Sequence, residues 1–559
     1  MKTSLRIGWI LLCLALAFVA RFWNAHDVFM EGKIYFVDGD CYSRMTRARM
    51  IAEGGPWIIQ HHDFENWPQG VTPHTTAAMD WSIVALEKVL QIGTQVIPIL
   101  RTSVLVGQTL DFAGALISPL LGVASVLAMG VILWRLAVPY GAAAMLVCVA
   151  SPILVHGTLL GRPDHQSLLM FLYTVALGTE LLLAAPRNPD PTPAPAAPGF
   201  LRKHGLALVN GLAWGASLWV SLYEPIILLA ISLILGRIFR QPSAAREKPE
   251  PVNFPVRYLR FIVMLAFVVI VFAIEGWRVS VPDETLRDEF SRWEKTIGEL
   301  SHLDLRSPLL GGWLGWGAFF APILLGLTGK QDRRAWSLLG LYLAVLGLTV
   351  WQVRWGYFLA IVFAWSLPWQ LMALRRWWAA WPVFLVSLWP MIQDWDQRLD
   401  DESESSTIAM QRAETVGLRD LVMATMRQPN SPFLAPWWLS PAIAYWSRQP
   451  GVAGTSHESL PGIVDTARFY LSTDPKEAAE ILRKRRVRWV LADEPAREIN
   501  TSRVLLGIPE PKDPMATILD EKPDEVPAYL AEWKAPTRPD GVRFYRLYEV
   551  DEAAIVSKP

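Results

Sequence analysis

The sequence predicts a multi-pass α-helical membrane domain followed by a small extracytoplasmic α/β domain. Of the 559 residues, 52% are hydrophobic and 27 are Trp, which is too apolar for a soluble domain of this length. Apolar runs long enough to cross a bilayer recur through the first 393 residues and then stop. We therefore expect the membrane domain in residues 1–393 and the α/β domain in residues 394–559.

The charge and cysteine content exclude several other classes of protein. Lys and Arg together number 52, as do Asp and Glu, so no excess of positive charge points to nucleic acid as a partner. The three cysteines, Cys13, Cys41 and Cys148, are widely scattered. They form neither a disulfide framework nor a CxxC metal-binding pattern.

The apolar runs predict eleven membrane spans. They lie near residues 6–22, 111–134, 139–157, 166–185, 204–220, 224–240, 258–276, 308–327, 334–351, 354–373 and 377–393. The first has the basic start and the Ala15-Leu16-Ala17 motif of a cleaved signal peptide. Its apolar run continues past that motif to Phe22, which favours an uncleaved anchor.

Basic residues in the short loops predict the orientation. With the N-terminus in the cytoplasm, these residues fall in the inside loops, as expected for a cell (inner) membrane protein. They are Arg135, Arg187, Arg202, Lys203, Arg237, Arg240, Arg246, Lys248, Arg257, Arg260, Lys330, Arg333, Arg334, Arg375 and Arg376. The loops 23–110 and 277–307 and the whole tail then lie outside.

The tail has the pattern of a small α/β domain. Residues 407–428 show a helical period, and residues 474–494, "DPKEAAEILRKRRVRWVLADE", predict a helix that runs into a buried strand. The segment "GVRFYRLYEV", residues 541–550, predicts a final strand.

Acidic residues occur in three separate outer loops. Asp38 and Asp40 lie in the first, Asp164 in "GRPDHQS", and Glu294 and Glu299 in "WEKTIGEL". Carboxylates gathered from separate segments are typical ligands of hard cations such as Mn²⁺ or Mg²⁺. The neighbouring His165 and Gln166 offer a nitrogen and an amide oxygen.

Arg354 opens an otherwise apolar span. A cation at that depth usually pairs with an anion or faces a cavity, and a lipid-linked phosphate is one such anion. A transporter would place charges near the membrane midplane, within its spans. Acids in the outer loops argue against that function.

Each of these features also has a structural interpretation. Asp38 and Asp40 suit a solvated loop, and Asp164 suits a helix N-cap. Arg354 suits an anchor whose charged end reaches the membrane interface. Trp and Tyr near the ends of spans suit an interfacial belt.

The order of the motifs resembles the catalytic subunit of oligosaccharyltransferase, a C-type membrane glycosyltransferase. Asp40-Cys41-Tyr42 is similar to its first acid motif and "GRPDHQS" to its second. "TIGE", Thr296 to Glu299, is similar to its TIxE motif, and Arg354 to an arginine that begins a late span. The family commonly has thirteen spans.

A fifth motif, WWDYG, is half present. Trp437 and Trp438 remain, while Leu439-Ser440-Pro441 stands where the family has Asp-Tyr-Gly. In the family, that Asp and the two Trp read the hydroxyl of an N-x-S/T acceptor. Its loss makes recognition of this sequon doubtful, because the hydroxyl loses an acceptor.

The resemblance implies a GT-C fold and a metal-dependent, inverting glycosyltransferase. Asp40, Asp164 and Glu299 would hold Mn²⁺ or Mg²⁺ with His165 and Gln166, and Arg354 would bind the donor phosphate. Asp40 and Glu299 would act as catalytic residues that orient the acceptor. Trp437, Trp438 and Thr296 would bind the acceptor.

The implied partners are a polyprenyl-linked glycan donor, the membrane lipid, and a protein, glycan or lipid acceptor. The expected function is transfer of a glycan from a polyprenyl-(pyro)phosphate to an acceptor, such as a protein Asn, on the outer face of the membrane. The alternative is a C-type glycosyltransferase that uses a polyprenyl-phosphate sugar to modify a lipid or polysaccharide.

Overall fold

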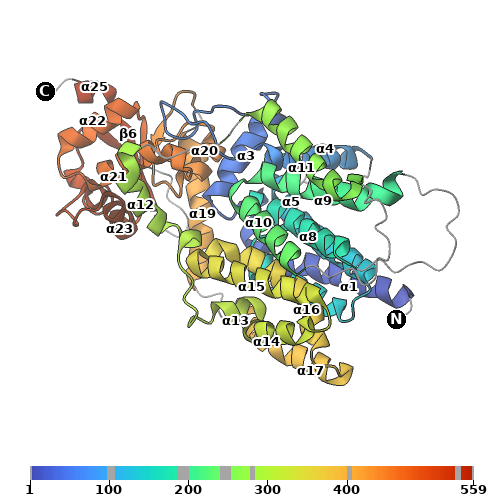
Figure 1. Cartoon of the computed structure of the whole chain (residues 1–559). Helices are drawn as coiled ribbons and strands as arrows, with labels where there is room; N and C mark the ends of the chain where they lie inside the picture. The colour runs from blue at the N-terminus through green and yellow to red at the C-terminus, as the bar shows by residue number, and fades with distance from the viewer. Residues whose placement is uncertain are drawn as a thin grey trace. The chain divides into compact units, whose positions relative to one another are not determined.

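The chain folds into two units, each built from segments far apart in the sequence (Figure 1). A computed structural model describes residues 3–96, 107–185, 200–239, 254–276, 278, 284–399, 406–426, 428–534 and 543–556. The first unit combines Met1–His26, Leu116–Trp277 and Ser301–Ser403. The second unit combines Asp27–Ala115, Arg278–Leu300 and Glu404–Pro559.

The described part of the first unit is helical. Its helices are α1 (Thr3–Arg21), α5 (Thr109–Leu136, from Leu116), α6 (Gly141–Ala150), α7 (Pro152–His156), α8 (His165–Leu183), α9 (Phe200–Val220), α10 (Tyr223–Ile238), α11 (Phe254–Glu275), α13 (Leu309–Leu314), α14 (Gly317–Gly329), α15 (Arg333–Trp351), η5 (Val353–Trp355), α16 (Gly356–Met372), α17 (Trp377–Ser387) and α18 (Trp389–Leu399). Each of the eleven predicted apolar runs is helical. The helices α8, α9 and α11 lie side by side.

Three of the runs expected to be unbroken are each split into two helices, so the prediction is wrong there. Pro152 begins α7, and the residue before a proline disfavours the helical conformation. Gly315 has φ 75°, outside the right-handed helical region, and separates α13 from α14. Pro390 lies in the first turn of α18, directly after the break that follows α17.

Burial separates a central helix from a peripheral one. Residues Gly356–Leu371 of α16 are buried, and α6, α14 and α15 pack against this helix. By contrast, only 6% of the apolar window Tyr258–Glu275 in α11 is buried. Helices that are apolar all round are typical of membrane spans, and an apolar surface left exposed suits contact with lipid.

Five helices of the described residues are long and apolar enough to cross a membrane. They contain Ser4–Arg21, Thr109–Leu136, His165–Leu183, Tyr258–Glu275 and Arg333–Trp351. This number comes from length and composition, and it is smaller than the eleven predicted spans because many of the other apolar helices are shorter than 18 residues.

The second unit holds the described strands and the remaining helices. Its elements are α2 (Ala25–Val28, from Asp27), β1 (Phe29–Met30), β2 (Lys33–Ile34), α3 (Gly39–Ala52), α4 (Ala78–Val96), η2 (Glu284–Leu286), α12 (Arg287–Trp293), η3 (Glu294–Thr296), η4 (Gly298–Leu300), α19 (Ser406–Thr425), β3 (Phe433–Leu434), α20 (Ser440–Ser447), η7 (His457–Ser459), α21 (Leu460–Leu471), α22 (Pro475–Arg485), β4 (Trp489–Ala492), α23 (Pro495–Leu506), α24 (Met515–Glu521), η8 (Pro523–Glu525), β5 (Leu530–Trp533), β6 (Arg546–Val550) and α25 (Glu552–Val556).

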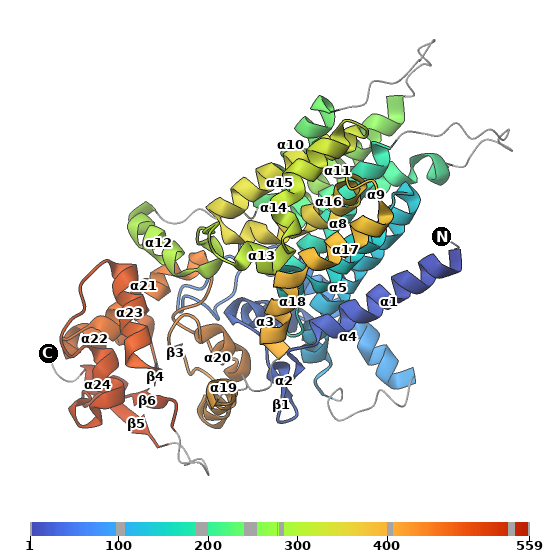
Figure 2. The same cartoon turned by 90° about the horizontal axis from the view of Figure 1, so that it is seen from below.

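The tail contains a four-stranded sheet in the order β3-β4-β6-β5, beside α22, α23 and α24 (Figure 2). Strand β4 pairs parallel to β3 and antiparallel to β6, with Val490 opposite Tyr548. The predicted helix, buried strand and final strand are confirmed as α22, β4 and β6. The prediction of a helix over 407–428 is confirmed as α19.

A buried arginine of the tail, paired with a tail carboxylate, connects the tail to the first-loop segment of the second unit. The guanidinium of Arg485 donates to Asp465 Oδ2 at 2.7 Å, and both side chains are buried. The same guanidinium donates to Asn66 Oδ1 at 3.0 Å and Gln69 Oε1 at 2.9 Å. Breaking such a buried pair typically costs about 3–5 kcal/mol, because one charge is left without its partner.

Candidate functional site

The predicted site residues belong to both units. The second unit contains Asp40, Thr296, Glu299, Trp437 and Trp438. The first unit contains Asp164, His165, Gln166 and Arg354.

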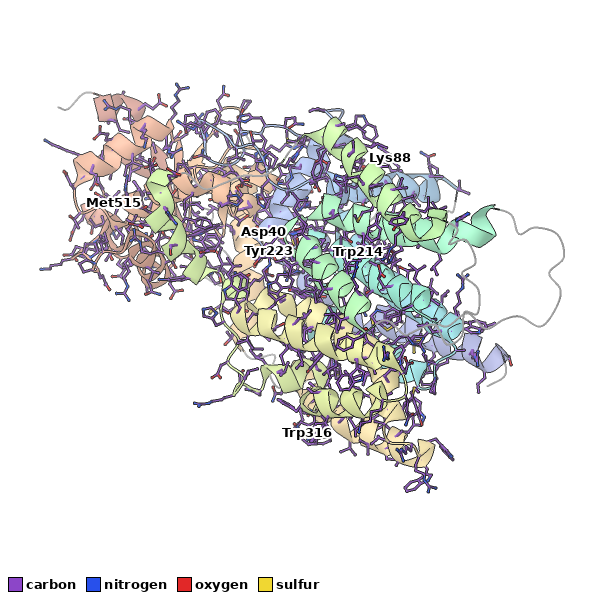
Figure 3. All side chains as sticks on the ribbon, viewed as in Figure 1. Asp40, Lys88, Trp214, Tyr223, Trp316 and Met515 are labelled. Atoms are coloured by element: carbon purple, nitrogen blue, oxygen red, sulfur yellow. The ribbon has the colours of Figure 1, made fainter. Side chains whose placement is uncertain are left out.

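The two acids of "DGD" have different roles at the start of α3. The Asp38 carboxylate accepts a hydrogen bond from the backbone N–H of Cys41 at 3.0 Å, so Asp38 is the N-cap of this helix. Asp40 lies in the first helical turn and is exposed (Figure 3). The capping interpretation thus holds for Asp38, while Asp40 is the acid that faces solvent.

The start of α3 lies against the segment that carries the two tryptophans. Helix α3 packs on α20. A Cβ on Gly39 would lie 2.7 Å from Thr455 Cγ2 and 3.5 Å from the carbonyl oxygen of Trp438. The first and fifth motifs, about 400 residues apart, therefore meet within the second unit, and the close approach requires glycine between the two acids.

Tyr42, the aromatic residue of the first motif, belongs to the core. Its ring packs edge-on against Phe36 at 5.2 Å and against Trp446 at 5.2 Å, measured between ring centroids. Its hydroxyl accepts a hydrogen bond from the Phe36 backbone N–H at 3.1 Å. This side chain anchors α3 to α20 and leaves Asp40 at the surface.

The segment that contains "TIGE" is fixed to the tail by aromatic and aliphatic packing. Trp293 is buried in a cluster with Leu460 and Ile463, and Ile297 packs against the same cluster. The Thr296 hydroxyl donates to the carbonyl oxygen of Trp293 at 2.7 Å and closes the turn. Glu299 follows in η4 and is partly exposed. Ile and Thr of this motif thus hold the turn that carries the acid.

Each of the two tryptophans of the tail has a partner within the second unit. The Trp437 ring lies 6.1 Å from the Trp293 ring, in an edge-on arrangement. The Arg497 guanidinium stacks over the Trp438 ring at 4.6 Å. Sequence reasoning missed Arg497, because nothing in "EPAREIN" indicates its partner. A cation over an aromatic ring adds about 0.5–1 kcal/mol at exposed sites.

Ser440 is turned away from the surface. Its residue is buried, and its Oγ donates towards the carbonyl oxygens of Ala435 and Pro436, each at 3.0 Å. Helix α20 begins at Ser440 with Pro441 in its first turn. The hydroxyl proton of Ser440 is therefore held within the fold, and Ser440 does not replace the missing Asp of WWDYG.

In the first unit, Asp164, His165 and Gln166 lie together at the start of α8. Asp164 occupies the N-cap position, but its side chain makes no capping hydrogen bond. Instead its Oδ1 lies 2.6 Å from His165 Nδ1, and its Oδ2 lies 3.8 Å from a nitrogen of Arg162. Asp164 thus occupies the expected N-cap position, but its carboxylate contacts these side chains and does not cap the helix.

Gln166 fits a ligand for a hard cation. Its side-chain oxygen is buried and has no hydrogen-bond partner within the ranges that the structure describes. A buried polar atom without a partner usually marks a place for an ion or a water molecule. Together with the Asp164 carboxylate, this amide oxygen offers the chemistry that Mn²⁺ and Mg²⁺ prefer.

Arg354 pairs with an acid that sequence reasoning missed. In η5, its guanidinium donates to the carboxylate of Glu224, which is fully buried at the start of α10. Ser221 Oγ donates to the same carboxylate at 2.5 Å, and the imidazole of His165 interacts with it electrostatically. An acid opening the apolar run "EPIILLA" was the available signal for Glu224.

Glu224 thereby links two predicted motifs within the first unit. Arg354 contacts it directly, and His165, which contacts Asp164, acts on it electrostatically. Arg354 thus has an anionic partner within the first unit, and its binding to a donor phosphate stays a prediction. The side chain of Arg354 keeps 22% of its surface exposed.

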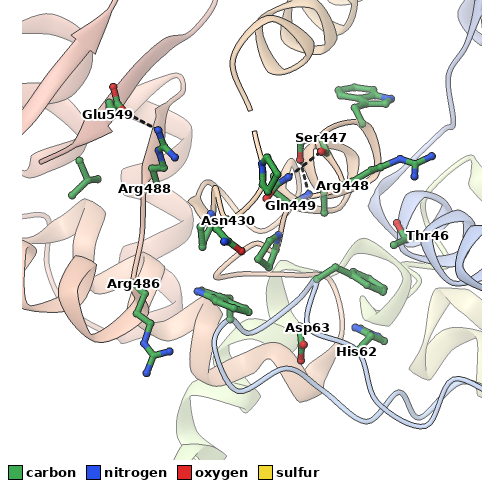
Figure 4. A pocket seen from close by; sticks show the side chains of 18 of the residues that line it. Thr46, His62, Asp63, Asn430, Ser447, Arg448, Gln449, Arg486, Arg488 and Glu549 are labelled. Atoms are coloured by element: carbon green, nitrogen blue, oxygen red, sulfur yellow. Dashed lines mark hydrogen bonds and ion pairs between the residues drawn. The ribbon is translucent and has the colours of Figure 1, made fainter. Parts of the chain in front are cut away.

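The second unit also contains a cavity of about 1710 Å³ (Figure 4). It lies between the first-loop segment, with His62 and Asp63, and the tail, with Asn430, Gln449 and Arg488. None of the predicted site residues is among the described residues that line it. The cavity and the candidate site are therefore different places.

The close approach at Gly39 leads to a test of how the first and fifth motifs pack. We expect Gly39→Ala to destabilise the protein by about 1–3 kcal/mol, because its new methyl group overlaps that of Thr455. Thr455→Ser removes the opposing methyl group, so the double variant should regain most of the lost stability. Thermal unfolding of the purified protein measures both effects, with Thr455→Ser alone as control. A double variant as unstable as Gly39→Ala would contradict this packing.

Comparison with known proteins identifies the fold. No protein-family model and no curated protein matches the chain. The archaeal oligosaccharyltransferase AglB from Archaeoglobus fulgidus, solved with an inhibitory peptide and a dolichol-phosphate, is similar at 15% identity and a TM-score of 0.63, over 100% of this chain and 75% of that chain. The oligosaccharyltransferase of the same organism solved with Zn and sulfate gives 16% identity and a TM-score of 0.59, over 95% and 72% of the two chains.

ArnT from Cupriavidus metallidurans bound to undecaprenyl phosphate is similar along its whole length. The identity is 14% and the TM-score is 0.54, over 100% of both chains. At such low identity the likeness shows the fold alone. The chain has the GT-C fold of membrane glycosyltransferases, as predicted, with a small sheet region near its C-terminus.

Proposed function

We propose that this protein is a membrane glycosyltransferase that moves a glycan from a polyprenyl-(pyro)phosphate donor to an acceptor on the outer face of the cell (inner) membrane. The observation that carries the proposal is the GT-C fold over the full chain, shared with two proteins solved with a dolichol-phosphate and an undecaprenyl phosphate. The acidic motifs that resemble oligosaccharyltransferase support it. Fold likeness by itself is an argument by analogy, so the residues must carry the chemistry.

Asp40, Asp164 and Glu299 would hold the divalent cation, with His165 and Gln166 beside them. The exposed carboxylate of Asp40 and the orphaned amide oxygen of Gln166 support this assignment. When bound, Mn²⁺ or Mg²⁺ would supply Lewis-acid stabilisation of charge on the leaving phosphate.

Arg354 would bind the donor phosphate with a guanidinium that is also paired with Glu224. Charge-assisted hydrogen bonds from a planar guanidinium suit a phosphate. Asp40 and Glu299 would orient the acceptor nucleophile, and one of them would accept its proton as the anomeric bond forms. Attack opposite the leaving phosphate inverts the configuration at the anomeric carbon.

The acceptor distinguishes two forms of the proposal. In the first, an oligosaccharyltransferase-like enzyme transfers to a protein Asn, with Trp437, Trp438 and Thr296 against the acceptor. In the second, a sugar from a polyprenyl phosphate is added to a lipid or polysaccharide. The inward-facing Ser440 and the absent carboxylate favour relaxed sequon use or the second form.

Removal of the proposed metal ligands tests the catalytic assignment. We expect Asp40→Asn, Asp164→Asn and Glu299→Gln each to abolish transfer from a polyprenyl-linked donor, because each change removes a charged oxygen ligand. EDTA should abolish transfer by the unaltered protein, and Mn²⁺ or Mg²⁺ should restore it. Asp38→Asn, which keeps a capping side chain, is the matched control and should retain activity. Full activity in EDTA would rule out the metal-dependent mechanism.

The Arg354–Glu224 pair needs a test that separates donor binding from folding. Arg354→Ala alone leaves the Glu224 carboxylate buried without this partner and is expected to destabilise the protein. We therefore expect the double variant Arg354→Met, Glu224→Gln to fold and to bind donor about tenfold or more weakly, since a charged hydrogen bond contributes about 1.5–3 kcal/mol.

Donor titration of transfer rates measures this change. Glu224→Gln alone is the control: it keeps the arginine and removes the like charge beside the phosphate, so its donor affinity should equal or exceed that of the unaltered protein. Equal donor affinity in the double variant and the unaltered protein would exclude Arg354 as the phosphate-binding residue.

The fifth motif leads to a prediction about the acceptor. We expect transfer to an N-x-T peptide and to the same peptide with Ala for Thr to differ by less than about tenfold, because an apolar site does not strongly reject a missing hydroxyl. Ser440→Ala should leave this ratio unchanged, since its hydroxyl is used within the fold. A preference of about a hundredfold or more for the Thr peptide would show that another residue reads the sequon.

A further inference from the structure

A second group of metal-ligating side chains lies in the second unit, apart from the carboxylates discussed above. His74 comes from the segment between α3 and α4, and His457 and Glu458 come from η7 in the tail. One ligand atom from each of the three lies within 4.8 Å of the others. Nothing in the sequence pattern predicts this group, because His74 and Glu458 are 384 positions apart.

The distances within the group suit a small cation. His74 Nδ1 lies 2.8 Å and 3.0 Å from the two oxygens of Glu458, and His457 Nε2 lies 3.6 Å from Oε1. Ligands of tetrahedral Zn²⁺ at about 2.0 Å from the metal lie about 3.3 Å from one another. The distances from Glu458 to the two imidazoles lie on both sides of that value, so the carboxylate is placed to share a metal ion with them.

The carboxylate of the group is held in place and charged. The backbone N–H of His74 donates to Glu458 Oε1 at 2.9 Å. Burial opposes ionisation of Glu458, but hydrogen bonding and charge from His74, with the charge of His457, outweigh it and lower its pKa to about 2. The side chain of His74 is 39% exposed, which gives solvent access for a metal and a fourth, water ligand.

We propose that His74, His457 and Glu458 form a binding site for Zn²⁺ or a similar transition-metal ion. Two imidazoles and one carboxylate are a common zinc ligand set, whereas Mn²⁺ and Mg²⁺ prefer oxygen ligands. The site is therefore chemically distinct from the carboxylate site of the proposed function and does not depend on it.

The position of the site indicates what the metal does. It joins the first-loop segment to the tail, and the His457 ring lies 6.4 Å from Phe290 of α12, which precedes "TIGE". Three segments that carry proposed site residues thus meet at or beside it. Bound Zn²⁺ would stabilise their joint fold by mass action.

Cobalt replacement tests ligation directly in the full-length protein in detergent. In His74→Cys and His457→Cys a thiolate replaces an imidazole, so the metal site is kept. After the protein is stripped of metal, Co²⁺ should produce a thiolate-to-cobalt absorption band in each variant. His61→Cys, an exposed histidine of the same segment, is the matched control and should give no band. The three buried native cysteines are present in every sample.

Zinc binding provides the second measurement. Calorimetric titration with Zn²⁺ should show a site in the unaltered protein and in Asp40→Asn, and binding at least about 100-fold weaker in the double variant His74→Ala, His457→Ala. Zn²⁺ should raise the unfolding temperature of the unaltered protein but not that of the double variant. Absence of the cobalt band in both cysteine variants, or equal zinc affinity in the double variant, would overturn the proposal.

Discussion

The buried pair between Arg485 and Asp465 is the interaction on which the second unit depends. Arg485 ends α22 in the tail, yet its guanidinium also binds Asn66 and Gln69 in the first-loop segment. A buried guanidinium is tolerated when its donors are paired, so these segments must fold together. The same arrangement positions Asp40. Helix α3, which carries this exposed acid, belongs to the first-loop segment and packs against α20 of the tail.

Local patterns predicted the elements well, and long-range partners poorly. Apolar period and length located all eleven helical runs of the membrane domain, and the pattern of residues 474–494 located α22 and β4. The breaks at Pro152, Gly315 and Pro390 lie inside continuous apolar runs, where hydropathy alone does not separate one helix from two. Proline and glycine chemistry was the missing signal.

In the candidate site, too, local motifs were predictable from the sequence and long-range partners were not. Residue type and the order of the motifs were enough to predict four candidate site residues, Asp40, Asp164, Glu299 and Arg354. Glu224 lies 130 positions from Arg354, Glu458 lies 384 positions from His74, and Arg497 lies 59 positions from Trp438. A single sequence does not contain these pairings. The structure also shows that some residues within the motifs have structural roles. Asp38 caps a helix, Tyr42 fills the core, and Thr296 closes a turn.

The negative charge of Glu224 opposes the binding of a donor phosphate to Arg354 in the proposed function. It already neutralises Arg354, so a phosphate that binds this arginine also meets a buried carboxylate nearby. Like charges at short range in a poorly solvated place repel strongly. The proposed metal ion would relieve this repulsion, because it would add positive charge at Asp164, and the neighbouring His165 acts electrostatically on Glu224. Metal and donor should therefore bind cooperatively, through two residues that connect the second and fourth motifs within one unit.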